Sequence, residues 1–282
     1  MRHSAVLLID CPDRKGLVAS VSGLLYRFGA NILHADQHQD PEAGLFFMRV
    51  EWAMEGFALE EFRAAFQSMA AELQMRWSLE LLSARPKMAI FVSKYLHCLV
   101  DILHRYQTGE LHCLIPVIIG NHPDAGALAA FYGVEFHYLA VVPESKRDAE
   151  RAQLDLLRER EIDLIVLARY MQVLSPEFVA AYPNRIINVH HSFLPAFMGA
   201  KPYHAALRRG VKLIGATSHY VTEALDDGPI IEQDVVRISH RDQVEDLIAK
   251  GRDLERVVLS RAIRWHLERR LLCYGSKTVV FD

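Results

Sequence analysis

The sequence predicts an α/β protein made of two domains, a small antiparallel sandwich followed by an open and mainly parallel sheet. The first observation is the order of predicted elements over residues 1–82, which is βαββαβ and is typical of a split-βαβ sandwich. The second is a polar linker over residues 83–87. The third is the alternation of short apolar runs with helical segments over residues 88–282, which favours a sheet with helices on both faces.

In the first domain, some segments show the apolar spacing of a strand and others show that of a helix. A turn between residues 10 and 16 separates the first strand from an amphipathic helix, and Gly29 ends that helix. A second turn lies over residues 40–44. The predicted strands cover residues 5–9, 30–37, 45–52 and 76–82, and the predicted helices cover 17–28 and 59–75.

In the second domain, the apolar runs are nearly continuous, as expected of strands that are buried on both faces. The carboxyl ends of such strands are where open α/β sheets bind ligands. The predicted strands cover residues 88–92, 113–118, 134–138, 163–167 and 186–190, with a final pair over 211–221 and 230–238. The predicted helices cover residues 95–107, 124–131, 146–158 and 244–272.

The composition excludes several classes of protein. Lysine and arginine total 32 against 35 aspartates and glutamates, so the chain lacks the basic surface of a nucleic-acid-binding protein. No apolar run has the length of a membrane span. The four cysteines form no C-x-x-C pair, which is typical of reduced thiols, and the first residues lack the apolar core of a signal peptide. We therefore expect a cytoplasmic protein.

The most informative segment is the end of the strand predicted over residues 186–190. Asn188 and His190 are two residues apart, so their side chains point to the same face of the strand. An amide that can stabilise an oxyanion then lies beside a group that transfers protons near neutral pH. A lone histidine at a strand end is more often structural, but the coincidence of these features favours catalysis.

A second polar segment supplies a carboxylate, Asp226, which precedes Gly228 and Pro229. If Asp226 approaches His190, it favours the imidazolium form, which suits donation of a proton to a leaving amine. Alternatively, Asp226 holds an attacking water. Because no serine or cysteine nucleophile is evident, the three residues indicate attack by water or by an external amine on a small carbonyl.

Two further histidines are secondary candidates. His191 is expected on the face opposite to His190, as a core residue or behind the site. His219 precedes Asp226 by seven residues and is expected near the site. The sequence contains no H-E-x-x-H motif and no compact Cys/His quartet, so we do not expect a metal.

The segment after the strand predicted over residues 163–167 combines backbone hydrogen-bonding groups with apolar side chains. It is suited to bind a flat heterocycle, with Met171, Val173 and Leu174 lining an apolar slot. The simpler interpretation is an ordinary strand-to-helix connection in which Ser175 is the N-cap and Pro176 the first helical residue. Capping does not exclude contact with a ligand.

Together, Asn188-x-His190, the loop at residues 192–195 and the spacing of His219 and Asp226 resemble the 10-formyltetrahydrofolate-dependent formyltransferases, over about residues 87–282. The resemblance implies a Rossmann-like domain of formyltransferase type at residues 88–282 and catalytic roles for Asn188, His190 and Asp226. It also implies that a set of residues around the 169–174 loop binds folate. This set is Arg169, Tyr170, Met171, Val173, Leu174 and His219.

Two departures from the purine-pathway transferases are visible. Those enzymes carry a glycine-rich loop after the first strand that cradles a phosphate, whereas residues 91–97 contain no glycine. They also tend to carry a basic residue after the Leu-Pro pair, where this chain has Ala196. A site without a docking surface for an amine acceptor leaves water as the nucleophile.

With those departures, residues 11–18 and 29–32 make the whole chain resemble the formyltetrahydrofolate deformylase family. In that family a ferredoxin-like ACT domain precedes the formyltransferase-type domain. The resemblance implies either an amino-acid effector or a domain that only mediates assembly into a homo-oligomer, with a tetramer favoured. The matching effector positions are Asp10, Asp13, Gly16 and Asn31.

The leading hypothesis is hydrolysis of 10-formyltetrahydrofolate to formate and tetrahydrofolate, with no cofactor beside this substrate. Such an enzyme would supply formate for purine biosynthesis and balance one-carbon folate pools. The second hypothesis is a formyltransferase to an amine acceptor, which uses the same three residues. The third is a folate-binding protein that responds to amino acids, and intact Asn188, His190 and Asp226 argue against it. We expect neither nucleic acid nor a membrane as a partner.

Overall fold

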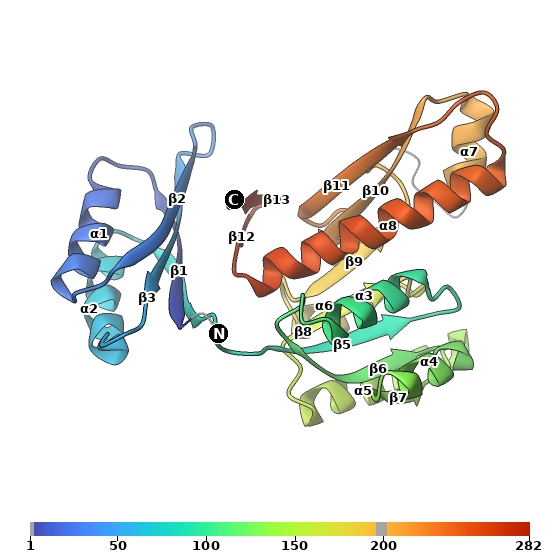
Figure 1. Ribbon diagram of the computed structural model, residues 1–282, viewed down its shortest axis with the longest axis horizontal. Helices are drawn as coiled ribbons and strands as arrows, with labels where there is room; N and C mark the ends of the chain where they lie inside the picture. Colours follow the sequence, from blue (N-terminus) through green and yellow to red (C-terminus); the bar gives the residue numbers. More distant parts are fainter. Residues whose placement is uncertain (1–2, 196–201) are drawn as a thin grey trace. The chain divides into compact units, whose positions relative to one another are not determined.

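The computed structural model of the protein describes residues 3–195 and 202–282. It confirms the predicted fold class, because a four-stranded antiparallel sheet with two helices is followed by a seven-stranded mixed sheet (Figure 1). The chain divides into two compact units. The first holds the chain up to Arg85 together with Glu268–Tyr274 and Val279–Asp282, and the second holds Pro86–Leu267 and Gly275–Thr278.

The first unit is built on a sheet with the strand order β2-β3-β1-β4, in which neighbouring strands run antiparallel. Helices α1 and α2 lie on the same face of this sheet, where their apolar residues bury Leu7, Ile9 and Trp52 (Figure 1). The strands are β1 (Ser4–Pro12), β2 (Ile32–Asp40), β3 (Leu45–Ala53) and β4 (Arg76–Leu81). The helices are α1 (Leu17–Arg27) and α2 (Leu59–Glu72).

The other face of this sheet is covered by C-terminal residues, where the sequence prediction of a helix over residues 244–272 is wrong. Helix α8 (Val244–Leu267) ends at Leu267 because Arg269 adopts a left-handed backbone conformation, with φ at 53°, that a right-handed helix cannot continue. The strands β12 (Leu271–Tyr274) and β13 (Lys277–Val280) follow. Their side chains pack on the residues of β1 and β3 that face away from the helices. The buried members of this cluster are Val6, Leu8, Phe47, Val279 and Phe281.

This packing changes the domain division expected from the sequence. The sequence assigns all of residues 88–282 to the second domain, whereas Glu268–Tyr274 and Val279–Asp282 group with the first unit. Arg49 on β3 fixes the return of the chain, because its guanidinium donates to the backbone carbonyls of Glu268 and Arg269, at 3.3 and 3.0 Å. Alternating apolar residues at the C-terminus therefore form strands that complete a sheet sandwich.

The second unit is built on a sheet with the order β11-β10-β9-β8-β5-β6-β7. The strands from β9 to β7 run parallel to one another, while β10 and β11 run antiparallel to their neighbours. The strands are β5 (Lys87–Val92), β6 (Leu114–Gly120), β7 (Glu135–Tyr138), β8 (Leu164–Ala168), β9 (Ile186–His190), β10 (Leu213–Tyr220) and β11 (Ile230–Arg237).

Two groups of helices pack on this sheet. Helices α5 and α6 bury Leu157 and Phe178 against alternate residues of four parallel strands. Helix α8 runs along β9, β10 and β11 and also packs against α3 (Figure 1). The helices are α3 (His97–Gln107), α4 (Gly126–Phe131), α5 (Lys146–Glu159), α6 (Pro176–Ala181) and α7 (Pro202–Arg209), with short 3-10 turns at η1 (Pro123–Ala125) and η2 (Pro143–Ser145). Among the helices described, none is sufficiently long and apolar to cross a membrane.

The topology brings three distant segments to one end of the sheet. Residues 169–174 follow β8, and residues 191–195 follow β9, which is parallel to β8. Strand β10 returns antiparallel to β9, so that His219 lies directly opposite Asn188. The connection from β10 to β11 begins beside the amino end of β9, where the backbone N–H of Val221 donates to the carbonyl of Ile186, and its residues 221–226 line the same cavity as the other two segments. Helix α7, which the sequence analysis did not predict, precedes β10.

The tight connection between β10 and β11 requires glycine at position 228. A Cβ atom there would lie 1.8 Å from the backbone oxygen of Tyr220, and a backbone neighbour cannot rotate away. We expect Gly228→Ala to destabilise the protein by about 1–3 kcal/mol in thermal or denaturant unfolding, because the connection must shift. The matched control is Gly23→Ala within α1, where nothing lies within 4 Å of the added Cβ. It should be neutral or stabilising by up to about 1 kcal/mol, and equal losses in the two variants would contradict the steric explanation.

Candidate active site

Asn188 and His190 lie on β9, between β8 and β10 in the middle of the sheet. As predicted from their spacing, both side chains face one cavity, of about 420 Å³, beside the carboxyl end of the strand. His190 is buried, and Asn188 is partly buried. Hydrogen bonding to strands on both sides holds the backbone of β9, so the two side chains are fixed relative to each other.

The structure brings Asp226 to His190. Asp226 lies in the β10–β11 connection with φ at 55°, a left-handed conformation that aspartate tolerates better than most residues. Its Oδ2 atom lies 3.2 Å from Nδ1 of His190, and its Oδ1 atom lies 3.6 Å from Nε2 of His219. The neighbouring imidazoles of His190, and then of His219, hold the pKa of Asp226 well below its usual range. The carboxylate is therefore ionised at neutral pH and can accept a hydrogen bond from Nδ1 of His190.

The second ring nitrogen of His190 is available for chemistry. Because Nδ1 faces Asp226, Nε2 points elsewhere, and it is buried without a hydrogen-bond partner among the described residues. Buried polar atoms are nearly always hydrogen-bonded in folded proteins. An unpartnered imidazole nitrogen beside a cavity is suited to exchange a proton with a bound molecule.

His191 lies beside His190 rather than on the opposite face as predicted. Their ring centroids are 5.0 Å apart, and His191 also contacts the ring of Tyr203, at 6.0 Å. The prediction was wrong because His191 follows the end of β9, where the alternation of a strand no longer applies. Burial, and then the charges of Arg169 and His190, lowers the pKa of His191 to about 4. His191 is thus a neutral ring at physiological pH.

The loop at residues 169–174 forms one wall of the cavity, as the sequence predicted for a ligand-binding connection. Met171 and Val173 are about half exposed at the rim, with 52% and 53% of their surface accessible, while Leu174 is buried. These side chains form an apolar slot. The capping prediction is also confirmed, because Ser175 accepts a hydrogen bond from the backbone N–H of Phe178 and Pro176 begins α6.

Tyr170 anchors this loop in the protein interior. Its ring packs edge-on against Phe91, with centroids 5.2 Å apart, and its hydroxyl oxygen accepts a hydrogen bond from Gln153 at 3.0 Å. Burial raises the pKa of Tyr170 to about 12. Ser93 holds the other side of the loop, because its Oγ atom accepts a hydrogen bond from the backbone N–H of Met171. Tyr170 therefore shapes the slot from behind.

A buried network that the sequence analysis missed lies on the far side of His191. At its centre is Glu255 on α8, which is only 2% exposed. Its carboxylate contacts Nε2 of His97 at 2.7 Å, the hydroxyl of Tyr203 at 2.9 Å and Nε of Arg169 at 3.4 Å. Burial alone raises the pKa of Glu255, but the hydrogen bond from His97 and the charge of Arg169 outweigh it and hold the pKa below its usual value.

Glu255 could have been found from the spacing of buried residues on α8. Leu247, Gly251, Glu255 and Leu259 recur every four residues, so the carboxylate lies on the apolar stripe of its helix. A charged residue in that position indicates a buried partner of opposite charge. Gly251 serves the same network, because a Cβ there would lie 2.0 Å from the hydroxyl of Tyr203.

His97, Cys98 and Glu255 place three possible metal-ligating atoms within 4.8 Å of one another. The residue types suit a transition metal. However, the guanidinium of Arg169 lies beside the same Glu255 oxygen that contacts His97, and this positive charge opposes a second cation. Burial and then the charge of Glu255 also raise the pKa of the Cys98 thiol far above neutrality. The cluster is better described as a hydrogen-bonded structural network.

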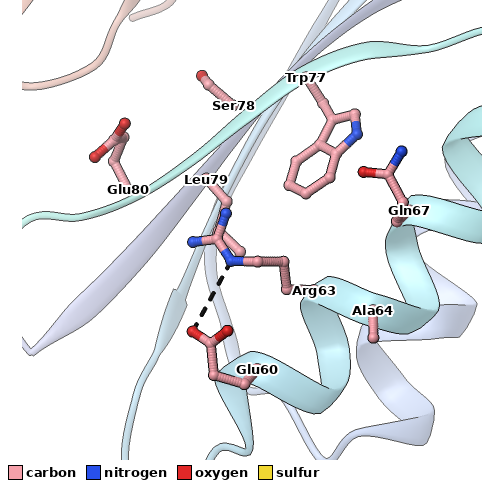
Figure 2. Close-up of a pocket in the computed structure, with 8 residues that line it drawn as sticks. All are labelled: Glu60, Arg63, Ala64, Gln67, Trp77, Ser78, Leu79 and Glu80. Atoms are coloured by element: carbon pink, nitrogen blue, oxygen red, sulfur yellow. Dashed lines mark ion pairs between the residues drawn. The ribbon is translucent and has the colours of Figure 1, made fainter.

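The first unit has a larger hollow, of about 650 Å³, between α2 and β4 (Figure 2). Trp77 on β4 lies opposite Gln67 on α2, Leu79 lies beside Arg63, and the dashed line marks the ion pair between Arg63 and Glu60, at 3.9 Å. No histidine or cysteine is among the residues that line it. This hollow therefore lacks a group that transfers protons near neutral pH, and the smaller cavity at His190 is the candidate active site.

The positions proposed for an effector are only partly brought together. Asp13 and Gly16 line a separate hollow of about 630 Å³ near the start of α1, and Gln39 donates a hydrogen bond to Asp13 there. Asp10 and Asn31 are not among the residues that line it. The carboxylate of Asp10 is buried and bound by Arg76, at 2.6 Å. The backbone oxygen of Asn31 accepts a hydrogen bond from the backbone N–H of Ala53.

Comparison with known proteins supports the division of the chain. A model of the formyl transferase family matches residues 86–263, and a model of the ACT domain matches residues 5–51. A formyltetrahydrofolate deformylase of Synechocystis sp. is 54% identical over 280 residues, which cover 99% of this chain and 98% of that protein. This chain belongs to the formyltetrahydrofolate deformylase family. The corresponding protein of Bacillus subtilis is 51% identical over 98% of this chain and 93% of its own length.

Solved structures separate the deformylase family from the transferases. The crystal structure of a formyltetrahydrofolate deformylase from Pseudomonas syringae pv. tomato matches with a TM-score of 0.97 and 46% identity, over 99% of this chain and 94% of that chain. A glycinamide ribonucleotide transformylase 1 from Symbiobacterium toebii matches with a TM-score of 0.66 and 32% identity, over 70% of this chain and 95% of its own. The predicted membership in the deformylase family is thus confirmed. Ala196, one of the two predicted departures from the transferases, lies outside the described residues.

The buried network of this deformylase-family chain should be important for stability. We expect Glu255→Ala to lower the free energy of unfolding by about 3–5 kcal/mol, because Arg169 is left as a buried charge without its partner. The matched control is Asp253→Ala on the same helix, which removes an exposed ion pair with Arg256. The control should cost less than about 1 kcal/mol. Denaturant unfolding measures both, and a loss at Glu255 no larger than at Asp253 would show that the network adds little.

The buried imidazole of His191 should make stability depend on pH. Its pKa is about 4 in the folded protein and ordinarily 6.5, so the unfolded chain binds more protons between these values. Stability should therefore fall as the pH drops from 6.5 to 4, by up to about 3 kcal/mol from this group. His191→Gln should flatten the fall measured by denaturant unfolding, whereas His204→Gln, at an exposed position of α7, should not. Identical slopes for both variants would refute the assignment.

Proposed function

We propose that this chain hydrolyses 10-formyltetrahydrofolate to formate and tetrahydrofolate, the activity that the names of its relatives describe. The observation that carries the proposal is the meeting of Asn188, His190 and Asp226 at one cavity with an apolar rim. An amide donor, an imidazole and an ionised carboxylate are the groups required to cleave a formamide with water.

In the proposed reaction, the amide of Asn188 donates a hydrogen bond to the formyl oxygen. Water attacks the formyl carbon, and the oxyanion that forms is stabilised by this donor. Asp226 holds the water or stabilises the imidazolium of His190, which lies 3.2 Å away. His190 transfers a proton to N10 of the folate as the carbon–nitrogen bond breaks. The oxygen of water remains in formate, and its two protons are distributed between N10 and the solvent.

The apolar slot is the proposed site of the folate ring system. Met171 and Val173 offer exposed apolar surface at its rim, and the backbone of residues 169–174 offers hydrogen-bonding groups. Arg169 and Tyr170 act differently from simple ligand contacts, because their side chains are held by Glu255 and Gln153. Their proposed role is to keep the loop in the shape that receives the heterocycle.

Release of formate without an acceptor tests the proposed hydrolysis. The purified protein is mixed with 10-formyltetrahydrofolate alone, and formate and tetrahydrofolate are quantified over time. Equal molar release of the two products is expected. Turnover that appears only when an amine acceptor is added would instead favour the transferase hypothesis, which uses the same three side chains.

Asp226→Asn should leave the fold intact and lower kcat by a factor of about 10² or more, because the amide cannot stabilise the imidazolium as the carboxylate does. The matched control is Asp227→Asn, an adjacent and exposed carboxylate that is not among the residues lining the cavity. This control should retain nearly the wild-type rate. Steady-state kinetics of formate release measures both variants, and similar rates for the two would contradict the role of Asp226.

We further propose that the first unit binds an amino-acid effector in the hollow beside Asp13 and Gly16. The hollow lies near the N-terminus of α1 and carries polar and charged groups that suit a small zwitterion. Titration of single amino acids into the formate assay tests this, with Asp13→Ala as the variant that should lose the response. No response to any amino acid would leave assembly as the role of this unit.

The proposed setting is a cytoplasmic homo-oligomer, with a tetramer favoured, that supplies formate for purine biosynthesis and balances one-carbon folate pools. Exposed apolar residues on the edge strand β2, Ile32 and Leu33, support self-association. Light scattering of the purified protein measures the mass directly, and a monomer at assay concentration would exclude the oligomer.

A further inference from the structure

His219 has an environment that folate binding does not explain. It lies on β10 directly opposite Asn188 on β9, at a position where the pairing of β10 with β11 shifts register. Such an irregularity re-aims a side chain. His219 is only 2% exposed, so most of its ring is in contact with protein. The surrounding atoms therefore determine what this ring does.

The hydrogen bond at Nδ1 fixes the tautomer of the neutral His219 ring. Nδ1 lies 2.9 Å from the backbone oxygen of Tyr220. A carbonyl oxygen only accepts hydrogen bonds, so Nδ1 must carry the proton and donate it. In a neutral imidazole the other nitrogen then has a lone pair and no proton. Nε2 of His219 is therefore an acceptor.

This acceptor faces the amide of Asn188. Nε2 of His219 lies 3.2 Å from Nδ2 of Asn188, and only the amide nitrogen has hydrogens to donate. One N–H of Asn188 is thus directed at His219. The second N–H of the same nitrogen and the amide oxygen are then held in a fixed plane, because the amide group is planar.

The direction of this amide decides whether Asn188 can stabilise an oxyanion. Rotating the amide by half a turn exchanges its donor with its acceptor at nearly the same positions. A carbonyl oxygen aimed at the developing charge would repel it, whereas an N–H stabilises it. A protonated His219 would present N–H at Nε2 toward the amide nitrogen and toward Oδ1 of Asp226, 3.6 Å away. The neutral ring is the form that keeps the donor in place.

We propose that His219 is a positioning residue that acts through Asn188, accepting one hydrogen bond from its amide and thereby directing the other N–H at the formyl oxygen. This inference rests on the proposed function, in which Asn188 stabilises the oxyanion. It assigns to His219 a role other than contact with the folate ring.

Two substitutions separate this role from the alternatives. His219→Gln keeps an oxygen that can accept the hydrogen bond of Asn188, whereas His219→Phe keeps the ring volume and removes the acceptor. Steady-state formate release should show kcat reduced by a factor on the order of 10² in the Phe variant, with KM within about twofold of wild type. The Gln variant should retain at least about one tenth of wild-type kcat. Equal loss in both variants would point to the imidazole charge, and greater activity with Phe to a packing role, and either result overturns the proposal.

A double-mutant cycle tests whether His219 acts through Asn188. In an Asn188→Ala protein the amide is absent, so adding His219→Phe should lower kcat less than about threefold further. A full additional loss in the double variant would overturn the inference while leaving the role of Asn188 intact. Full activity of Asn188→Ala alone would instead defeat the proposed function, so the two failures are distinguishable. Circular dichroism and thermal unfolding check that each variant is folded.

Nitrogen NMR of the unsubstituted protein gives a second, independent readout. With ¹⁵N-labelled histidine, the ring resonances of His219 are those missing from the spectrum of His219→Gln. At neutral pH they should show a protonated Nδ1 and an unprotonated Nε2, as expected from the hydrogen bond to Tyr220. A proton on Nε2 would overturn the proposal even if the Phe variant failed to fold.

Discussion

The antiparallel pairing of β10 with β9 is the constraint on which the candidate site depends. The other strands of the second unit that surround the site run parallel, and their carboxyl ends supply only the 169–174 loop and the Asn188–His190 pair. Strand β10 enters at the carboxyl end of β9, places His219 opposite Asn188 and ends beside the amino end of β9, where the backbone N–H of Val221 donates to the carbonyl of Ile186. An antiparallel strand can be joined to the next strand by a short connection, whereas a parallel strand needs a long crossover. The short β10–β11 connection lines the cavity and brings Asp226 to His190, so strand direction, and not residue type alone, determines where the carboxylate lies.

Two carboxylates, the partly buried Asp226 and the buried Glu255, act on the neutral ring of His191. On one side, Asp226 is shared by His190 and His219, and on the other, Glu255 is shared by His97, Tyr203 and Arg169. The three partners of Glu255 offset the cost of burying its charge. Arg169 links the second cluster to the 169–174 loop. Glu255 on α8 therefore helps to hold the loop that forms one wall of the cavity, through its contact with Arg169.

The parts of this site that alternate along one strand were predictable from sequence. Two residues of β9 at strand spacing place Asn188 and His190 together, and the βα connection with Ser175 and Pro176 was predicted with its cap. The approach of Asp226 needed the family resemblance, because strand direction cannot be read from apolar runs. Glu255 was missed because residues 244–272 were predicted only as one long helix, without a prediction of which residues face the interior. Leu271 and Leu272 continue the helical spacing of α8. They lie in a strand because the left-handed backbone conformation of Arg269 ends the helix and because the first sheet has an apolar face on which this segment packs. His191 was misplaced because a period of two holds only within a strand.

The sheet of the first unit is closed by residues that are made long after its own strands. Val279 and Phe281, which pack with Val6 and Leu8, follow them in the sequence only after the whole seven-stranded sheet of the second unit. During synthesis the helix-covered side of this sheet can therefore assemble early. The other apolar face of the sheet stays exposed to water until β12 and β13 have been made. Contacts of such long sequence separation form slowly. A shortened chain that stops at the linker would carry that uncovered face permanently and would be prone to aggregate, so the ACT module of this protein is not a portable domain.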